Sequence, residues 1–181
     1  FSVPTLRYLD FYPQPNQAGP VNYRTLTGVP RDEDSLLAKI DHAFSDNNRL
    51  SGRYVYQQTD NPNAVAAIRD FGTRIPTRSQ NVALNDTHTF SPTTLLDLRL
   101  SWNRQLLKEL APRHFTDFDV QRELGVTVPT SARPGTIENG MPNVSITGFA
   151  SLGDSLVSPL VQPDENYQIV TGLSKLKGKH A

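Results

Sequence analysis

The stretch Thr94–Arg104, with the sequence TLLDLRLSWNR, decides the fold. Apolar side chains occupy one parity and polar side chains the other, in the order Leu96, Asp97, Leu98, Arg99, Leu100, Ser101, Trp102 and Asn103. This period of two places neighbouring side chains on opposite faces of a strand, and it excludes an amphipathic helix. At a rise of about 3.3 Å per residue and a tilt of about 40°, the strand spans roughly 28 Å, which is close to the thickness of the hydrocarbon core of a membrane.

Two β-hairpins are predicted around this pattern. The first covers residues 36–59, because two alternating runs are joined by the turn-forming residues 45–48. The second covers residues 80–104 and turns through residues 91–93. The hairpins repeat each other: a His-x-Phe-Ser motif begins at His42 and again at His88, 46 residues later, and a leucine follows eight residues after each histidine. Such a repeat predicts successive hairpins of one sheet.

Composition fits a membrane barrel better than a compact soluble core. Only 36% of the residues are hydrophobic, and there are 14 prolines and 11 glycines. A barrel needs fewer apolar residues, because one parity faces lipid while the other faces a polar interior. The 18 basic and 18 acidic residues cancel, so no net field favours binding to nucleic acid. Cysteine is absent from the sequence, which excludes disulfides and thiolate metal sites.

The remaining residues are interpreted mainly as connections. Residues 1–35 are expected to form a loop with a possible strand at 22–29, and residues 60–79 and 105–165 form long loops. Within the second loop, a short helix is expected near Asp117–Leu124 and a short strand at 143–149. A returning strand over 167–176 and a turn at 177–179 are expected to fill residues 166–181. Because the chain starts at Phe1 and stops just after this strand, we expect an internal piece of a longer protein.

The fold class predicted from these patterns is all-β: an antiparallel up-and-down meander that forms part of a large transmembrane β-barrel. The turns at 45–48, 91–93 and 177–179 are expected on the periplasmic side, and the two long loops outside. The alternative is a soluble secreted β-sandwich binding module, for example one that binds carbohydrate, because alternation alone does not separate a lipid-facing parity from a sandwich core. A hydrolase on an all-β scaffold ranks last, since no motif supplies a nucleophile, an acid or a base.

Several motifs resemble the barrel of Oar-like TonB-dependent receptors of the acidobacterial type. They include Lys39-Ile40-Asp41-His42 followed by Phe44-Ser45, Arg49-Leu50-x-Gly52-Arg53-Tyr54, Thr87-His88-Thr89-Phe90-Ser91-Pro92, Leu100-x-Trp102-Asn103-Arg104, Gly148-Phe149-Ala150-Ser151-Leu152-Gly153-Asp154, and Leu173-Ser174 before Lys177-Gly178-Lys179-His180. The resemblance covers most of the chain from about Tyr12. It implies an outer-membrane transporter that takes up a large or scarce ligand with energy passed through the TonB system. Members of this family also have a signal peptide, a carboxypeptidase regulatory-like domain, a plug and further barrel strands, and none of these parts is expected within these 181 residues.

Candidate functional residues follow from these expectations. An aromatic membrane girdle is predicted from residues near strand ends on the apolar parity: Phe44, Tyr54, Tyr56, Phe90 and Trp102. Ligand contacts are expected in the long outer loops, where Phe71, Arg74, Phe115, Phe118 and Phe149 are available. His42 and His88 are interpreted as girdle residues and not as metal ligands. The expected partners are outer-membrane lipid, the TonB system through other parts of the parent protein, and an imported ligand. No cofactor, metal, nucleic acid or catalytic residue is expected.

Charged residues on the polar parity are expected to point into the barrel interior. They are Asp41, Arg53, Asp97 and Arg99. They are expected to pair across strands or to meet the plug, and pairing is expected over ligand contact.

Overall fold

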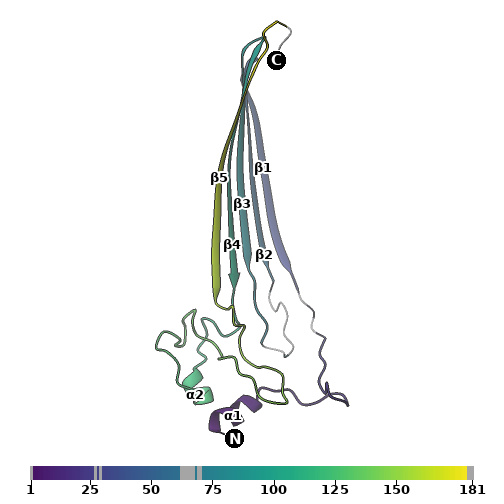
Figure 1. Cartoon of the computed structure of the whole chain (residues 1–181), viewed down its shortest axis with the longest axis vertical. Coiled ribbons are helices and arrows are strands. Elements are labelled where there is room, and N and C mark those ends of the chain that lie inside the picture. The colour runs from purple at the N-terminus through teal and green to yellow at the C-terminus, as the bar shows by residue number, and fades with distance from the viewer. Residues whose placement is uncertain (1, 27, 29, 62–67, 69–70, 179–181) are drawn as a thin grey trace. The chain divides into compact units, whose positions relative to one another are not determined.

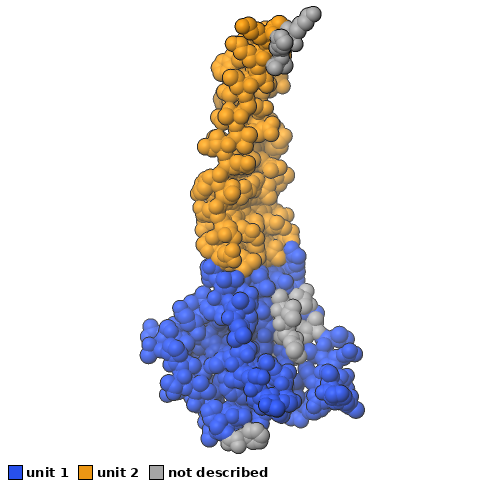
Figure 2. All heavy atoms as spheres, in the orientation of Figure 1, with its two compact units in different colours: residues 1–32, 60–76, 108–161 blue, residues 33–59, 77–107, 162–181 orange. Residues whose placement is uncertain are grey.

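The computed structural model describes residues 2–26, 28, 30–61, 68 and 71–178. The chain divides into two compact units, which are coloured separately in Figure 2. One unit, called here the sheet unit, contains residues 33–59, 77–107 and 162–181. The other, called the loop unit, contains residues 1–32, 60–76 and 108–161.

Five long strands form one sheet in the order β1-β2-β3-β4-β5, so every strand lies beside its neighbours in sequence (Figure 1). The strands are β1 (Asp32–Ser45), β2 (Asn48–Asp60), β3 (Thr77–Ser91), β4 (Thr94–Glu109) and β5 (Leu160–Lys175). They form an antiparallel up-and-down meander, as predicted. Each strand has 13 to 16 residues, which exceeds the usual strand of a soluble protein and suits a tilted crossing of a bilayer.

The register brings residues of equal parity onto one face across neighbouring strands. Gly52 lies opposite Leu84, and Leu84 lies opposite Leu100. Ile40 of β1 reaches the same face, because a Cβ added to Gly52 would lie 3.2 Å from both Ile40 Cγ2 and Leu84 Cδ2. The absence of a side chain at Gly52 therefore lets apolar side chains of the adjacent strands meet above it.

The boundaries of the strands correct several sequence-based expectations. The loop predicted at 105–165 is shorter, because β4 continues to Glu109 and β5 begins at Leu160. Pro163 was interpreted as a loop residue, but it lies in β5. This strand is at the edge of the described sheet, where the missing N–H of a proline is tolerated. β1 includes the acidic residues 32–34, which were expected in the loop over residues 1–35, and Glu33 accepts a hydrogen bond from Gln57 Nε2 at 2.6 Å.

The smaller expected elements also differ. Residues 1–35 were expected to form a loop with a possible strand, but α1 (Val3–Leu9) begins after Ser2, whose hydroxyl accepts from the Thr5 N–H. The described residues of 22–29 contain no strand, and the strand expected at 143–149 is reduced to one bridge between Val144 and Leu152. The helix expected near 117–124 is α2 (Val120–Leu124). Residue 179 of the predicted third turn lies outside the described residues.

The loop unit has its own small core. Its buried apolar side chains come from α1, α2 and the connections between strands: Tyr8, Ile68, Val120, Leu124, Met141 and Leu152. Arg7 Nη1 of α1 donates to the Arg122 carbonyl oxygen of α2 at 2.9 Å. Short helices are marginal alone, so this packing is what holds α1 and α2. Within the described residues, no helix has both the length and the apolar character needed to cross a membrane.

Candidate functional site

The apolar face of the sheet carries three of the predicted girdle residues together. Tyr54 lies opposite Val82, and Val82 lies opposite Trp102, so Tyr54 and Trp102 share a face at one level of the sheet. Tyr56 follows two residues later on the same strand and the same face. These rings are half-buried by their neighbours within the sheet.

Phe44 and Phe90 lie at a second level, beside the two hairpin turns. Each contacts the histidine two residues before it: the ring centroids of His42 and Phe44 are 4.5 Å apart, and those of His88 and Phe90 are 4.4 Å apart. The sequence repeat is thus also a structural repeat. From the turn end of β4 to Trp102 the chain advances eight residues, or about 20 Å along the membrane normal at a tilt of about 40°. Two aromatic levels at this separation, with leucines between them, have the spacing of membrane girdles, and this role stays a prediction.

Polar groups on the apolar parity gather at two places, and one of these groups, Asp86, lies within the sheet opposite Leu50 and Leu98. Near the first turn, Asn48 Nδ2 lies 2.9 Å from His88 Nδ1 and donates to Asp86 Oδ1 at 3.2 Å. Near the long connections, Arg104 Nε lies 3.2 Å from Glu165 Oε1. Among the residues that the structure describes, no group of three or more His, Asp or Glu is placed to hold a metal ion.

The opposite, polar face has two parts that differ in how their side chains are paired. Toward the hairpin turns, charged groups are paired: Lys39 Nζ lies 2.8 Å from Asp41 Oδ2, and Arg99 Nη2 lies 3.6 Å from Asp97 Oδ2. Each of these ion pairs joins two residues of one strand, so they differ from the pairing across strands that was predicted for Asp41, Asp97 and Arg99. Arg53 instead contacts the amide oxygen of Asn81, with Nη2 at 3.5 Å.

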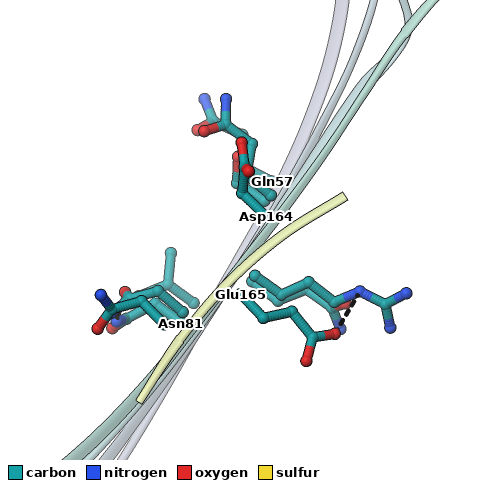
Figure 3. A pocket seen from close by; sticks show the side chains of 11 residues that line it. Gln57, Asn81, Asp164 and Glu165 are labelled. Atoms are coloured by element: carbon teal, nitrogen blue, oxygen red, sulfur yellow. Dashed lines mark hydrogen bonds and ion pairs between the residues drawn. The ribbon is translucent and has the colours of Figure 1, made fainter. Parts of the chain in front are cut away.

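Toward the long connections, the polar face is hollowed into a pocket of about 460 Å³. Its lining comes from four neighbouring strands and is rich in side-chain amides: Val55, Gln57, Ser79, Gln80, Asn81, Asn103, Arg104, Gln105, Asp164, Glu165 and Asn166. Figure 3 shows Gln57, Asn81 and Asp164 on one side of the sheet and Glu165 on the other. Six of the residues that line this pocket, called here the amide pocket, have side-chain amides, and sequence reasoning did not single it out.

In the loop unit, two of the five predicted ligand contacts lie in a cation–π cluster. Phe71 and Phe118 pack on the guanidinium of Arg113, whose Cζ lies 4.5 Å and 5.1 Å from their ring centroids. Phe11 adds a third ring at 5.6 Å. Both phenylalanines also pack against the buried core of the loop unit. Their side chains are engaged in this cation–π cluster, so they are poor candidates for direct ligand contact.

The Arg113 cluster continues to a buried carboxylate. Arg113 Nη1 lies 3.8 Å from Asp154 Oδ1, and the Met141 N–H donates to Asp154 Oδ2 at 2.6 Å. Burial raises the pKa of Asp154, against the opposing effects of the Met141 N–H and the Arg113 charge. Burial lowers the pKa of neighbouring His114, whose Nδ1 accepts from the Ala111 N–H at 3.2 Å. A buried, charge-paired cluster of this kind fixes the conformation of the connections.

The other three predicted contacts are placed differently. Arg74 is bound to the Asp60 carboxylate through both Nε and Nη2, which fixes the start of the 61–76 connection. Phe115 is 60% exposed, and its backbone has a φ of 60°, held by a hydrogen bond from its N–H to the Thr136 carbonyl at 2.9 Å. Phe149 is half exposed, with its ring centroid 5.1 Å from that of Tyr12. Phe115 and Phe149 therefore remain available as ligand contacts, and Arg74 is committed to Asp60.

One family model, described as an outer membrane beta barrel domain, matches residues 2–181. No curated protein and no solved structure matches the chain. The match covers nearly the whole sequence, and the five-stranded antiparallel meander agrees with it. The expectation of a soluble β-sandwich does not fit this family. Since outer-membrane barrels have at least about eight strands, the five strands form part of a barrel. The chain belongs to the outer membrane beta barrel domain family, and its place is the bacterial outer membrane.

Proposed function

We propose that this barrel segment belongs to a TonB-dependent transporter of the Oar-like type, which takes up a large or scarce ligand across the outer membrane. The observation that carries the proposal is the polar face of the sheet, which offers an amide pocket at the end from which the long connections leave. In a membrane barrel the polar parity lines the interior, so these amides lie on the path of a solute.

The long connections support the same role. Residues 110–159 form much of a unit with its own buried core, and this connection is far longer than a hairpin turn. Long, ordered loops on a rigid scaffold are typical of binding surfaces. The motif resemblance from Lys39 to His180 favours the TonB-dependent type over a passive pore. We also propose that the segment performs no catalysis.

The test is to purify the complete barrel protein and reconstitute it in planar lipid bilayers. A transporter whose interior is filled by a plug is expected to show no steady ion conductance, and it should bind the purified periplasmic domain of TonB. Steady conductance of an open pore, together with no TonB binding, would overturn the proposal in favour of a passive porin.

A second test of the proposed transport uses living cells. Uptake by an energised transporter should stop when the gene for TonB is deleted or when a protonophore collapses the proton gradient. A nutrient panel that compares wild-type cells with cells lacking the barrel gene gives the readout. Equal growth of the energised and de-energised strains on every nutrient that depends on the barrel gene would contradict the proposal.

A further inference from the structure

The polar face of the sheet changes character along its length. Toward the turns, polar side chains satisfy one another: Arg99 Nε donates to Asn85 Oδ1 at 3.2 Å, and Thr87 Oγ1 donates to Asp97 Oδ1 at 3.5 Å. Buried or lumen-facing polar groups commonly pair in this way. Toward the long connections, in the amide pocket, this pairing is incomplete.

Two amides of the amide pocket have no side-chain partner. Among the residues that the structure describes, neither Gln105 of β4 nor Asn166 of β5 forms a side-chain hydrogen bond, and both are exposed. Asn103 uses its amide oxygen to accept from Asn81 Nδ2, which leaves its own Nδ2 as a donor. Within the described part of the chain, Asp164 accepts from Gln162 Nε2 alone, at 3.3 Å, and its second oxygen stays available. The pocket therefore presents N–H donors and oxygen acceptors side by side.

The charged side chains that line the amide pocket disfavour an anionic ligand, although Arg53 lies beside the pocket and donates to Asn81 Oδ1 at 3.5 Å. The one lining cation, Arg104, is ion-paired with Glu165, and both side chains come from the opposite parity. The remaining lining charge is the Asp164 carboxylate, which repels phosphates and carboxylates. Metal cations of the Ca²⁺ type need several convergent oxygen ligands with more than one carboxylate, and the pocket face offers only one.

We infer that the amide pocket binds a neutral, hydroxyl-rich ligand, namely an uncharged oligosaccharide. Each hydroxyl is both a donor and an acceptor, so a row of amides and one carboxylate matches a row of hydroxyls without needing a cation. The volume of about 460 Å³ lies in the range of small-molecule sites. This inference rests on the proposed function, because it names the substrate class of the same barrel interior.

The test is isothermal titration calorimetry on the complete barrel protein in detergent. The probes are malto-, cello-, xylo- and manno-oligosaccharides, with glucose 6-phosphate as an anionic counterpart. At least one neutral oligosaccharide is expected to bind, and glucose 6-phosphate is not. Gln105→Met and Asn166→Leu keep side-chain volume but remove the amide, so each is expected to weaken the observed binding about tenfold.

Gln168→Met is the matched control. Gln168 lies on β5 on the same face, where its Oε1 accepts from Ser101 Oγ at 3.5 Å, but it does not line the amide pocket. Its replacement is expected to leave affinity unchanged. Circular dichroism of each variant verifies that the barrel has folded, and the double variant of Gln105 and Asn166 gives a second measurement if one single change is weak.

The inference is overturned if no neutral oligosaccharide of the panel binds, if glucose 6-phosphate binds more tightly, or if Gln105→Met and Asn166→Leu leave binding intact. These failures are separate from failure of the proposed function. A bilayer recording without conductance, together with TonB binding but no oligosaccharide binding, would support the proposed transporter and refute the inferred oligosaccharide ligand. Steady conductance together with oligosaccharide binding would support the inferred ligand and refute the TonB-dependent mechanism.

Discussion

Replacing Leu100 with arginine would place a charge near the middle of the lipid-facing surface. Leu100 lies opposite Leu84, in the row that also contains Gly52. It is six residues from Thr94, the first residue of β4, which corresponds to about 20 Å along the strand and about 15 Å along the membrane normal. The apolar band of such barrels is about 25 Å tall, so Leu100 lies close to the midplane. An arginine there costs about 2–4 kcal/mol.

Ser101→Arg is the matched control, one residue later on the polar face. Its side chain points to the polar interior near Gln168, so the expected cost is below about 1 kcal/mol. Both variants of the complete barrel are refolded into lipid vesicles, and the free energy of unfolding is measured by guanidinium titration with tryptophan fluorescence. Equal costs at the two positions, or a larger cost at Ser101, would refute the assignment of the two faces.

Three further predictions concern the loop unit. Arg113→Met removes the cation held by three phenylalanine rings and leaves Asp154 buried without its ion pair, so the loop unit is expected to lose about 3–5 kcal/mol, which hydrogen exchange of its amides measures. Burial raises the pKa of Tyr8 to about 12 from 10.0. The neutral Tyr8 side chain therefore stabilises the loop unit fully below pH 10, and this stabilisation is lost as the pH rises toward 12. Tyr8→Phe should abolish this alkaline transition in near-ultraviolet circular dichroism. Gly153→Ala should destabilise the loop unit by more than about 1 kcal/mol, because φ is 125° and a Cβ would lie 2.5 Å from the Pro142 carbonyl oxygen; unchanged protection of the Leu152 amide would contradict this.

The strands were predictable because their pattern is local. The alternation in Thr94–Arg104 and in the repeated His-x-Phe-Ser motifs specifies two faces without any knowledge of distant residues. The ends of β4 and β5 were less predictable. Residues 105–109 contain the adjacent pair Leu106-Leu107, which breaks the alternation, and Pro163 near the start of β5 is ordinarily a loop signal.

The loop unit could not be predicted because its contacts join residues far apart in sequence. Arg113 contacts Phe11 and Phe71, which lie in two other segments of the chain. No local pattern marks these rings as partners of one guanidinium, so Phe71 and Phe118 were interpreted as exposed ligand contacts. The amide pocket was hidden for a related reason: the parity of Gln105 and Asn166 is readable from sequence, but their lack of partners depends on the cross-strand register.

The most direct test of the central claim is to measure which parity of β4 faces lipid. The sequence has no cysteine, so single cysteines at residues 98, 99, 100 and 101 of the complete barrel can carry a spin label. Electron paramagnetic resonance then compares collisions with oxygen, which concentrates in lipid, and with a water-soluble nickel complex. Labels at positions 98 and 100 are expected to collide mainly with oxygen, and labels at positions 99 and 101 mainly with the nickel complex. Equal accessibility at all four positions, or the opposite alternation, would contradict the central claim.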